Sequence, residues 1–241
     1  MINWDKYFDH IYVISRCKNF DRRNHIDYIF DKIGITNYTY WYVPDFNFKD
    51  STIFKENKYI TKESRRRCAF GHFSCWKCLY ELDYDNILIV EDDASILYDE
   101  ESIQEILDEF EQKKDTSDIY MFDNIFYSGD DFANLYYIGT MYYCHRKGLD
   151  YLIRQHEKYN IMNDLYFYDF EKTRNNDLNF IKVEWDLHLG DFKYIHQSFN
   201  LEDISMLLNR SSRPLAIQKD KVLSDVNAKN SYKNINLDDY E

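Results

Sequence analysis

The sequence predicts an α/β domain with a mostly parallel central sheet flanked by helices. Short apolar runs rich in β-branched residues, such as residues 11–14 and 87–90, are typical of buried strands. Between and after these runs lie longer segments whose apolar residues recur with helical spacing. Strands that alternate with helices in this way favour a parallel sheet, because each helix returns the chain to the starting edge of the sheet.

The first predicted strand covers residues 11–14, and a helix is expected to begin at Asp21. Gly34 follows this helix at the place where a left-handed C-terminal cap is expected. The next strand covers residues 38–43 and ends at Pro44, which has no backbone N–H to donate to a neighbouring strand. The apolar face of the helix consists of Ile26, Ile29, Phe30 and Ile33.

The middle of the chain contains a polar stretch, residues 45–62, that is predicted to be a loop. A helix is expected over residues 64–82, and an apolar strand over residues 86–90 follows it. One face of that helix carries Cys68, His72, Cys75, Leu79 and Leu82.

The later elements are expected to be a helix over residues 99–114, strands over residues 119–122 and 136–144, and a helix over residues 147–156. The inner face of the first of these helices consists of Ile103, Ile106, Leu107 and Phe110. Residues 1–225 are interpreted as a single domain, followed by a polar tail over residues 226–241.

The composition excludes several classes of protein. The 241 residues include 30 Lys and Arg and 43 Asp and Glu, and this acidic excess argues against a nucleic-acid ligand. No apolar run approaches the roughly 20 residues of a membrane span, and the first residues lack the pattern of a signal peptide. We therefore expect a soluble, cytoplasmic protein whose five cysteines are free thiols. The bias toward Tyr, Asn and Lys suits an AT-rich bacterium and a large DNA virus equally.

The most informative motif is Glu91-Asp92-Asp93, which comes directly after an apolar strand. In open α/β sheets, ligands bind at the carboxyl ends of the strands. Neighbouring carboxylates repel one another and are costly to bury unless a cation lies between them. Mg²⁺ or Mn²⁺ would satisfy them, since both ions take oxygen ligands and also hold substrate phosphates. The alternative is a solvated acidic turn.

A second candidate lies in residues 184–188. If this segment is extended, Asp186 and His188 project to the same side, where they could complete a metal site or supply a base. In a helix the two side chains would point in nearly opposite directions. A surface loop is the alternative interpretation.

The helix predicted over residues 64–82 carries a cluster of possible metal ligands. Helical spacing places Cys68, His72 and Cys75 on one face, with Cys78 nearby, so zinc binding or redox chemistry is possible. Ligands on a single helix lie along a line, however, whereas structural zinc sites usually draw ligands from two loops. Buried, unreactive thiols are therefore expected.

Two arginine clusters, residues 22–23 and 65–67, stand at the starts of predicted helices. Guanidinium groups and helix N-termini both favour phosphate. We expect one or two of these five arginines to face a diphosphate and most of them to be exposed.

These segments together resemble glycosyltransferase family 25, which includes bacterial lipooligosaccharide galactosyltransferases and collagen galactosyltransferase domains. The resemblance is clearest at Glu91-Asp92-Asp93, which matches the Glu-Asp-Asp signature of the family. Other matches follow in family order at residues 11–14 with 21–23, 68–76, 138–140 with 146–148, 186–192 and 214–225. The departures are Ser15-Arg16 in place of a frequent Asn-Leu, Gly71 in place of Ser, and Trp185 in place of a Pro-Val or Pro-Ile step.

The resemblance implies a GT-A type fold, a UDP-linked sugar donor, a divalent cation that is usually Mn²⁺, and transfer with inversion. It implies Asp93 as the first metal ligand, assisted by Glu91 or Asp92, with His188 as a further ligand and Asp186 as the general base. The donor contacts that it implies are Ile14, Arg16, Arg22, Arg23, Asp45, Gly71, His72 and Asp92.

The reaction implied in this way moves a hexose, galactose or glucose, from a UDP-sugar to a hydroxyl of a glycan, glycolipid or protein acceptor. Two other functions fit the same acidic motif. One is a catalytically silent protein that binds sugar nucleotides, and the other is a metal-dependent phosphoesterase. Turnover of the donor distinguishes the enzyme from the silent binder, and phosphate release from simple esters would identify the phosphoesterase.

Overall fold

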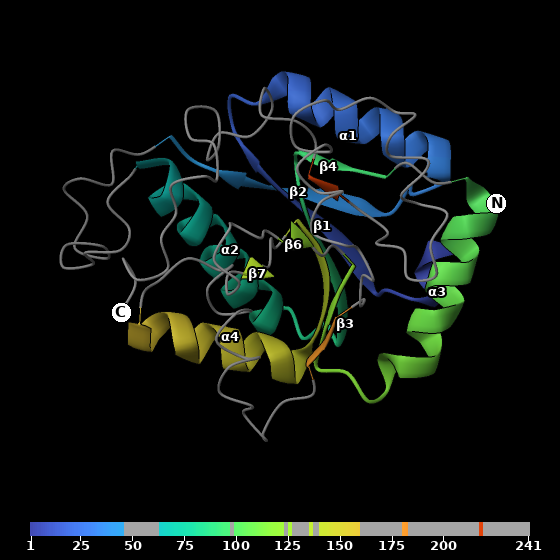
Figure 1. Ribbon diagram of the computed structural model, residues 1–241. Coiled ribbons are helices and arrows are strands. Elements are labelled where there is room, and N and C mark those ends of the chain that lie inside the picture. The colour runs from blue at the N-terminus through green and yellow to red at the C-terminus, as the bar shows by residue number, and fades with distance from the viewer. Residues whose placement is uncertain are drawn as a thin grey trace.

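In the computed structural model, the chain forms three layers, with helices on both faces of a central sheet (Figure 1). The structure describes residues 1–45, 63–96, 99–122, 125–126, 135–136, 140–159, 180–182 and 217–218. The helices are η1 (Trp4–Lys6), α1 (Phe20–Ile33), α2 (Glu63–Glu81), α3 (Glu100–Lys114) and α4 (Arg146–Tyr159). The strands are β1 (His10–Arg16), β2 (Tyr38–Val43), β3 (Asn86–Glu91), β4 (Ala94–Ser95), β5 (Ile119–Met121), β6 (Ile125–Phe126), β7 (Leu135–Tyr136), β8 (Met141–His145), β9 (Phe180–Lys182) and β10 (Ile217–Gln218).

The main sheet has six strands in the order β2-β1-β3-β8-β5-β9. Strand β1 pairs in parallel with β2 and β3, and β5 pairs in parallel with β9. Strand β8 lies between β3 and β5 and is antiparallel to both. The prediction of a mostly parallel sheet flanked by helices is therefore confirmed, with β8 as the reversed strand.

The alternation of side chains along each strand divides the core between the two faces of the sheet. In β1, Ile11 and Val13 pack with α1 and α3, whereas Tyr12 and Ile14 pack with α2. The same alternation occurs in β3. Leu88 packs on the first face, and the residues on either side of it, Ile87 and Ile89, pack on the second face. Each buried strand thus joins two helix layers, and its carboxyl end is held between them.

The helix ends follow the sequence signals. Gly34 has a φ of 77°, and its N–H bonds back to the last turn of α1, so the predicted left-handed cap is confirmed. At the start of α3, the side chain of Asp99 accepts a 2.8 Å hydrogen bond from the Ser102 N–H. The inner face predicted for α3 is buried as expected.

Two predictions differ from the structure. Residues 136–144, expected as one strand, are divided between β7 and β8, which belong to different sheets. Leu82, expected on one face of the helix with Cys75 and Leu79, lies beyond the end of α2 at Glu81 and is 52% exposed. The loop predicted over residues 45–62 falls, from residue 46 onward, outside the described residues, as does the polar tail over residues 226–241.

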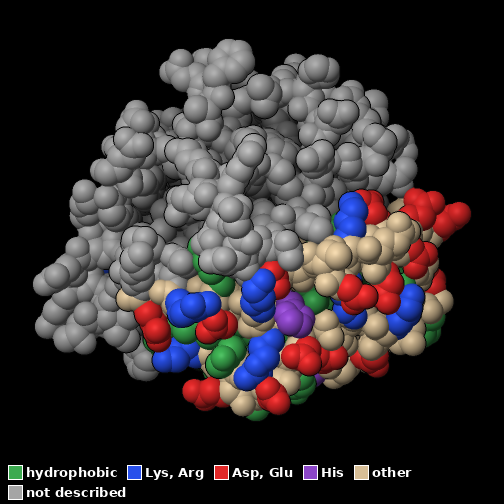
Figure 2. Space-filling view, turned by 90° about the horizontal axis from the view of Figure 1, so that it is seen from below, with side chains coloured by type: hydrophobic (Ala, Val, Ile, Leu, Met, Phe, Trp, Pro, Cys, Tyr) green, Lys and Arg blue, Asp and Glu red, His purple; other side chains and the backbone are tan. Residues whose placement is uncertain are grey.

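The surface seen in Figure 2 carries acidic and basic side chains that are intermixed over its described part. The apolar side chains on this part of the face are scattered and do not join into one patch. Among the helices in the described ranges, none has the length and apolar character that crossing a bilayer requires.

Two glycines allow helices to approach the sheet closely. At Gly148, in the first turn of α4, a Cβ atom would lie 2.3 Å from the backbone oxygen of Asp118 and 2.9 Å from Cys144 Sγ. At Gly71, in α2, a Cβ atom would lie 2.7 Å from Val43 Cγ2 and 3.1 Å from Ile14 Cγ2. A side chain at Gly148 would therefore collide with backbone, which cannot move. A side chain at Gly71 would collide with methyl groups, which can.

We predict that Gly148→Ala lowers the free energy of unfolding by about 3 kcal/mol or more, because overpacking against fixed backbone is costly. Gly71→Ala should cost less, since methyl groups can shift and alanine favours the helix by about 1 kcal/mol. Urea denaturation measures both effects, and Val43→Ala should restore stability to the Gly71→Ala protein only. Equal losses in the two single variants would contradict this account.

Candidate active site

The three acidic residues Glu91, Asp92 and Asp93 lie at the carboxyl end of β3, and their backbone is held from both sides. The N–H of Glu91 donates to the carbonyl of Thr140 at 2.7 Å, and the N–H of Asp92 donates to the carbonyl of Ile14 at 3.1 Å. Asp92 and Asp93 are buried and Glu91 is partly buried. The triplet is therefore not a solvated acidic turn.

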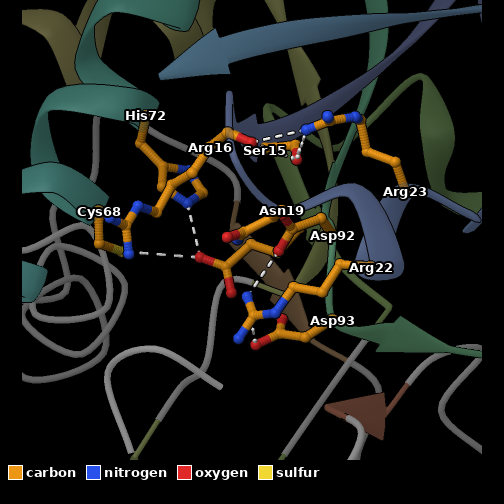
Figure 3. A network of polar contacts seen from close by, with 10 residues as sticks. Ser15, Arg16, Asn19, Arg22, Arg23, Cys68, His72, Asp92 and Asp93 are labelled. Atoms are coloured by element: carbon orange, nitrogen blue, oxygen red, sulfur yellow. Dashed lines mark hydrogen bonds and ion pairs between the residues drawn. The ribbon is translucent and has the colours of Figure 1, made fainter. Parts of the chain in front are cut away.

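The guanidinium of Arg22 lies between two of these carboxylates (Figure 3). Its Nη1 is 2.7 Å from Asp92 Oδ1 and 3.6 Å from Asp93 Oδ2. The second oxygen of Asp92 accepts a 3.0 Å hydrogen bond from Asn19 Nδ2. Arg22, which the resemblance implied as a donor contact, is 9% exposed and is a buried counter-ion to Asp92 and Asp93.

The neighbouring Arg23 has a different task. It is also buried, and its Nη1 donates to the carbonyl of Arg16 at 2.6 Å and to Ser15 Oγ at 3.2 Å. Its Nη2 donates to the carbonyl of Cys17 at 3.0 Å. Figure 3 shows Arg23 directed toward Ser15 and away from Asp92 and Asp93. Its contacts therefore fix the turn between β1 and α1, which places Arg22 against the acidic triplet.

Arg16 and Asp45, both expected to contact the donor, pair with each other at the carboxyl ends of β1 and β2. Arg16 Nε and Nη2 lie 3.2 and 2.5 Å from Asp45 Oδ1. The hydrogen bond and charge of Arg16 hold the pKa of the Asp45 carboxyl below its usual range. A sugar-nucleotide donor that binds to either side chain would therefore contact an ion pair that is already formed.

Glu91 faces α2, where it meets His72. The Nε2 atom of His72 is 2.8 Å from Glu91 Oε1, and Cys68 Sγ is 3.7 Å from the same oxygen. Burial, followed by the charge of Asp92, raises the pKa of Glu91 to about 7, although Arg22 opposes this shift. Glu91 therefore exchanges a proton near neutral pH when no cation is bound.

His72 is in turn contacted from behind by residues of β8 and α2. Its Nδ1 is 2.8 Å from Tyr142 Oη, and the indole N–H of Trp76 donates to the same oxygen at 2.7 Å. All three side chains are fully buried.

Ile14 and Gly71 also come together, but as packing partners. Ile14 is buried against α2 at the point where Gly71 leaves room for it, and its carbonyl accepts the Asp92 N–H. The donor contacts expected of these two residues remain predictions.

The chemistry of the donor set fits a hard divalent cation. Glu91 and Asp93 present carboxylate oxygens at one strand end, and such oxygens are the ligands that Mg²⁺ and Mn²⁺ prefer. Both oxygens of Asp92 already bond to Arg22 and Asn19. Glu91 and Asp93 are therefore the residues of the triplet that could hold the ion.

The sequence of residues 8–134 matches the family model described as glycosyltransferase family 25 (LPS biosynthesis protein), which is more than half of the chain. The chain belongs to glycosyltransferase family 25. The matched range contains Arg22, His72 and the acidic triplet, and the layered sheet with one reversed strand agrees with the predicted GT-A type fold.

No curated protein matches the sequence. Among solved structures, the apo form of mouse xyloside xylosyltransferase 1 is similar with a TM-score of 0.44 and 9% identity, over 89% of this chain and 98% of that chain. A structure assigned as a glucose-1-phosphate thymidylyltransferase from Bacillus anthracis, in complex with a sucrose, has a TM-score of 0.43 and 9% identity, over 73% of this chain and 87% of that chain.

Several residues predicted for the glycosyltransferase site are not placed with it. Asp186 and His188 lie outside the described residues, so their roles stay predictions. The residues considered as an alternative zinc site on α2 are divided, because Cys75 is buried in the apolar core whereas Cys68 and His72 face Glu91. Within the described ranges, the five cysteines of the glycosyltransferase are all free thiols.

Sequence reasoning missed Asn19, Trp76 and Tyr142. Trp76 lies in the segment 68–76, which resembles the family. Nothing in its spacing indicated a contact with Tyr142, which is 66 residues away. Asn19 directly precedes α1, a position typical of helix caps, yet its side chain makes no capping bond and binds Asp92 instead.

We predict that Arg22→Met lowers the free energy of unfolding by roughly 3–5 kcal/mol, because it leaves Asp92 and Asp93 buried without their guanidinium. The measurement is urea denaturation at neutral pH in the presence of EDTA. Arg154→Met is the control, since Arg154 is 67% exposed and pairs with Asp150 on the surface of α4. That pair should contribute less than about 1 kcal/mol. Similar losses in the two variants would show that the Arg22 pair is not a structural constraint.

A second prediction concerns pH. Because the folded pKa of Glu91 is raised from 4.5 to about 7, the folded protein keeps a proton that the unfolded chain releases. The contribution of Glu91 to stability is therefore greatest below pH 4.5 and declines until about pH 7, by roughly 2–3 kcal/mol in all. Glu91→Gln should remove this decline when unfolding is measured in EDTA across this range. Parallel pH profiles for the wild type and the variant would refute the assignment.

Proposed function

We propose that this glycosyltransferase moves a hexose, galactose or glucose, from a UDP-sugar to a hydroxyl of a glycan, glycolipid or protein acceptor. The transfer inverts the anomeric carbon and depends on Mn²⁺ or Mg²⁺. Family membership supplies the reaction class, and the family description as an LPS biosynthesis protein favours a bacterial glycolipid among the acceptors.

The observation that carries this proposal is the charge of the buried cluster. Glu91, Asp92 and Asp93 bring three carboxylates to one strand end, and Arg22 brings one guanidinium. When all are ionised, two negative charges remain, which one divalent cation would neutralise. In its absence Glu91 takes up a proton near neutral pH, as its raised pKa indicates.

The residues around the acidic triplet have different roles in the proposed reaction. Glu91 and Asp93 would hold the cation, which when bound supplies charge neutralisation for the diphosphate and the leaving nucleotide. Arg22 keeps Asp92 and Asp93 in place as an internal counter-ion. Arg16 and Asp45 pair with each other at the neighbouring strand ends, and this supports our inference that they would border the donor.

Inversion requires a base on the face of the sugar opposite the leaving group, and Asp186 is our candidate. We predict that Asp186→Asn still binds UDP but transfers no sugar to an acceptor. Binding is measured by calorimetry and transfer by product analysis. Loss of UDP affinity would instead make Asp186 a ligand of the donor or the cation.

We predict that the purified protein slowly hydrolyses one UDP-sugar of a panel in Mn²⁺ and not in EDTA. Released UDP is the readout, so no acceptor is needed. Asp93→Asn should lose the Mn²⁺-dependent release, whereas Glu109→Gln, on the exposed face of α3, should keep it.

The same panel identifies the alternatives. UDP binding without any release or transfer would favour the silent binder. Phosphate release from simple esters, with no preference for nucleotides, would favour the phosphoesterase. Absence of both UDP binding and Mn²⁺ binding would overturn the proposed donor and cation together.

A further inference from the structure

Four side chains form a continuous chain of hydrogen bonds that ends at the acidic triplet. Trp76 Nε1 is 2.7 Å from Tyr142 Oη, which is 2.8 Å from His72 Nδ1. His72 Nε2 is 2.8 Å from Glu91 Oε1. The first three side chains are fully buried, so this polar chain crosses the core between α2, β8 and β3.

When Glu91 is ionised, the chemistry of the four groups determines which atom donates in each of these hydrogen bonds. An indole N–H can only donate, and a carboxylate can only accept. The proton between His72 and Glu91 must therefore be on Nε2, so that Nδ1 of the neutral ring accepts from the Tyr142 hydroxyl. Burial raises the pKa of Tyr142 well above its usual value and keeps that hydroxyl protonated.

The contacts of Glu91 are confined to one of its two oxygens. Oε1 receives both His72 Nε2 and, at 3.7 Å, Cys68 Sγ. Oε2 has no hydrogen-bond partner in the part of the chain that the structure describes. With the Glu91 backbone bonded to Thr140, the hydrogen bond from His72 fixes the rotation of the carboxylate.

We propose that His72 is a positioning residue, whose ring is held by Trp76 and Tyr142 and whose Nε2 proton fixes Oε1 of Glu91, which leaves Oε2 available to the divalent cation. This inference rests on the proposed function. It assigns a role to Tyr142 and Trp76, which do not touch Glu91, and it separates the cation site from the thiol of Cys68.

One rival interpretation uses the same atoms. Cys68, His72 and Glu91 offer a sulfur, a nitrogen and an oxygen that all lie within 4.8 Å of one another, a donor set that suits zinc. Zinc would require His72 Nε2 to lose its proton, and this would remove the hydrogen bond to Glu91. The location of that proton therefore distinguishes the two interpretations.

Tyr142→Phe is the informative variant, because it removes only the hydroxyl behind His72. Tyr120→Phe is its matched control, since Tyr120 is also fully buried and its hydroxyl has no partner in the described residues. The measurements are the imidazole ¹⁵N spectrum of His72 in EDTA above pH 8 and the Kd for Mn²⁺.

In the wild type and in Tyr120→Phe we expect a protonated Nε2 and an unprotonated Nδ1. Tyr142→Phe should keep the proton on Nε2, because the ionised carboxylate of Glu91 still accepts it. The imidazole loses its anchor at Nδ1, so Mn²⁺ binding should weaken about tenfold, the lower end of the range for residues that orient a metal ligand. His72→Leu should weaken Mn²⁺ binding by roughly 10–100-fold. His72→Gln, whose amide can still donate to Glu91, should restore most of the affinity.

An unchanged Kd for Mn²⁺ in Tyr142→Phe would overturn the proposal. So would an unprotonated Nε2 in the wild type, or zinc that copurifies with the protein and is lost in Cys68→Ser. Failure of the proposed cation site gives a different result, because the wild type itself would then bind no Mn²⁺. Failure of the positioning role alone would leave Mn²⁺ binding equally strong in the wild type and in Tyr142→Phe.

Discussion

The buried guanidinium of Arg22 is the constraint on which the rest of the site depends. A charge removed from water is tolerated only when its partners are close and well bonded, and here the partners are Asp92 and Asp93. The contact joins the start of α1 to the end of β3 across 70 residues of sequence. Arg23 supports it from the other side by bonding three successive residues, the last two of β1 and the first of the following turn. The first turn of α1 therefore cannot move away from the triplet without leaving buried charges unpaired.

The same contact makes three acids that look equivalent in the sequence into three different groups. Asp92 has both oxygens engaged by Arg22 and Asn19, so its role is to hold the helix. Asp93 shares the guanidinium at a longer distance, 3.6 Å. Glu91 faces a histidine instead, and burial raises its pKa to about 7. A cation that binds here would replace a proton on Glu91, which links its affinity to pH.

Sequence reasoning predicted the layered α/β architecture and, in detail, local features of the helices. The apolar face of α3 and the left-handed cap at Gly34 depend on residues within a few turns, so their pattern is sufficient. The features that sequence reasoning missed depend on contacts between residues far apart in the sequence. Strand β8 exists as a separate element because it pairs with both β3 and β5. Arg22 is buried because of a contact that no spacing in the sequence reveals. The motif indicated the position of the candidate site, but the contacts of Asn19 and Tyr142 could be recognised only once the chain was folded.

The position of Gly71 explains one departure from the family pattern through packing. For His72 to reach Glu91 at 2.8 Å, the backbone of α2 must lie close to the sheet. Gly71 permits this, since a Cβ atom there would lie 2.7 Å from a methyl group of Val43 and 3.1 Å from one of Ile14. The serine common in the family would need smaller neighbours or a helix placed farther from the sheet. Gly71, Val43 and Ile14 are therefore interdependent, and the glycine reflects the distance between α2 and the sheet without requiring a changed donor contact.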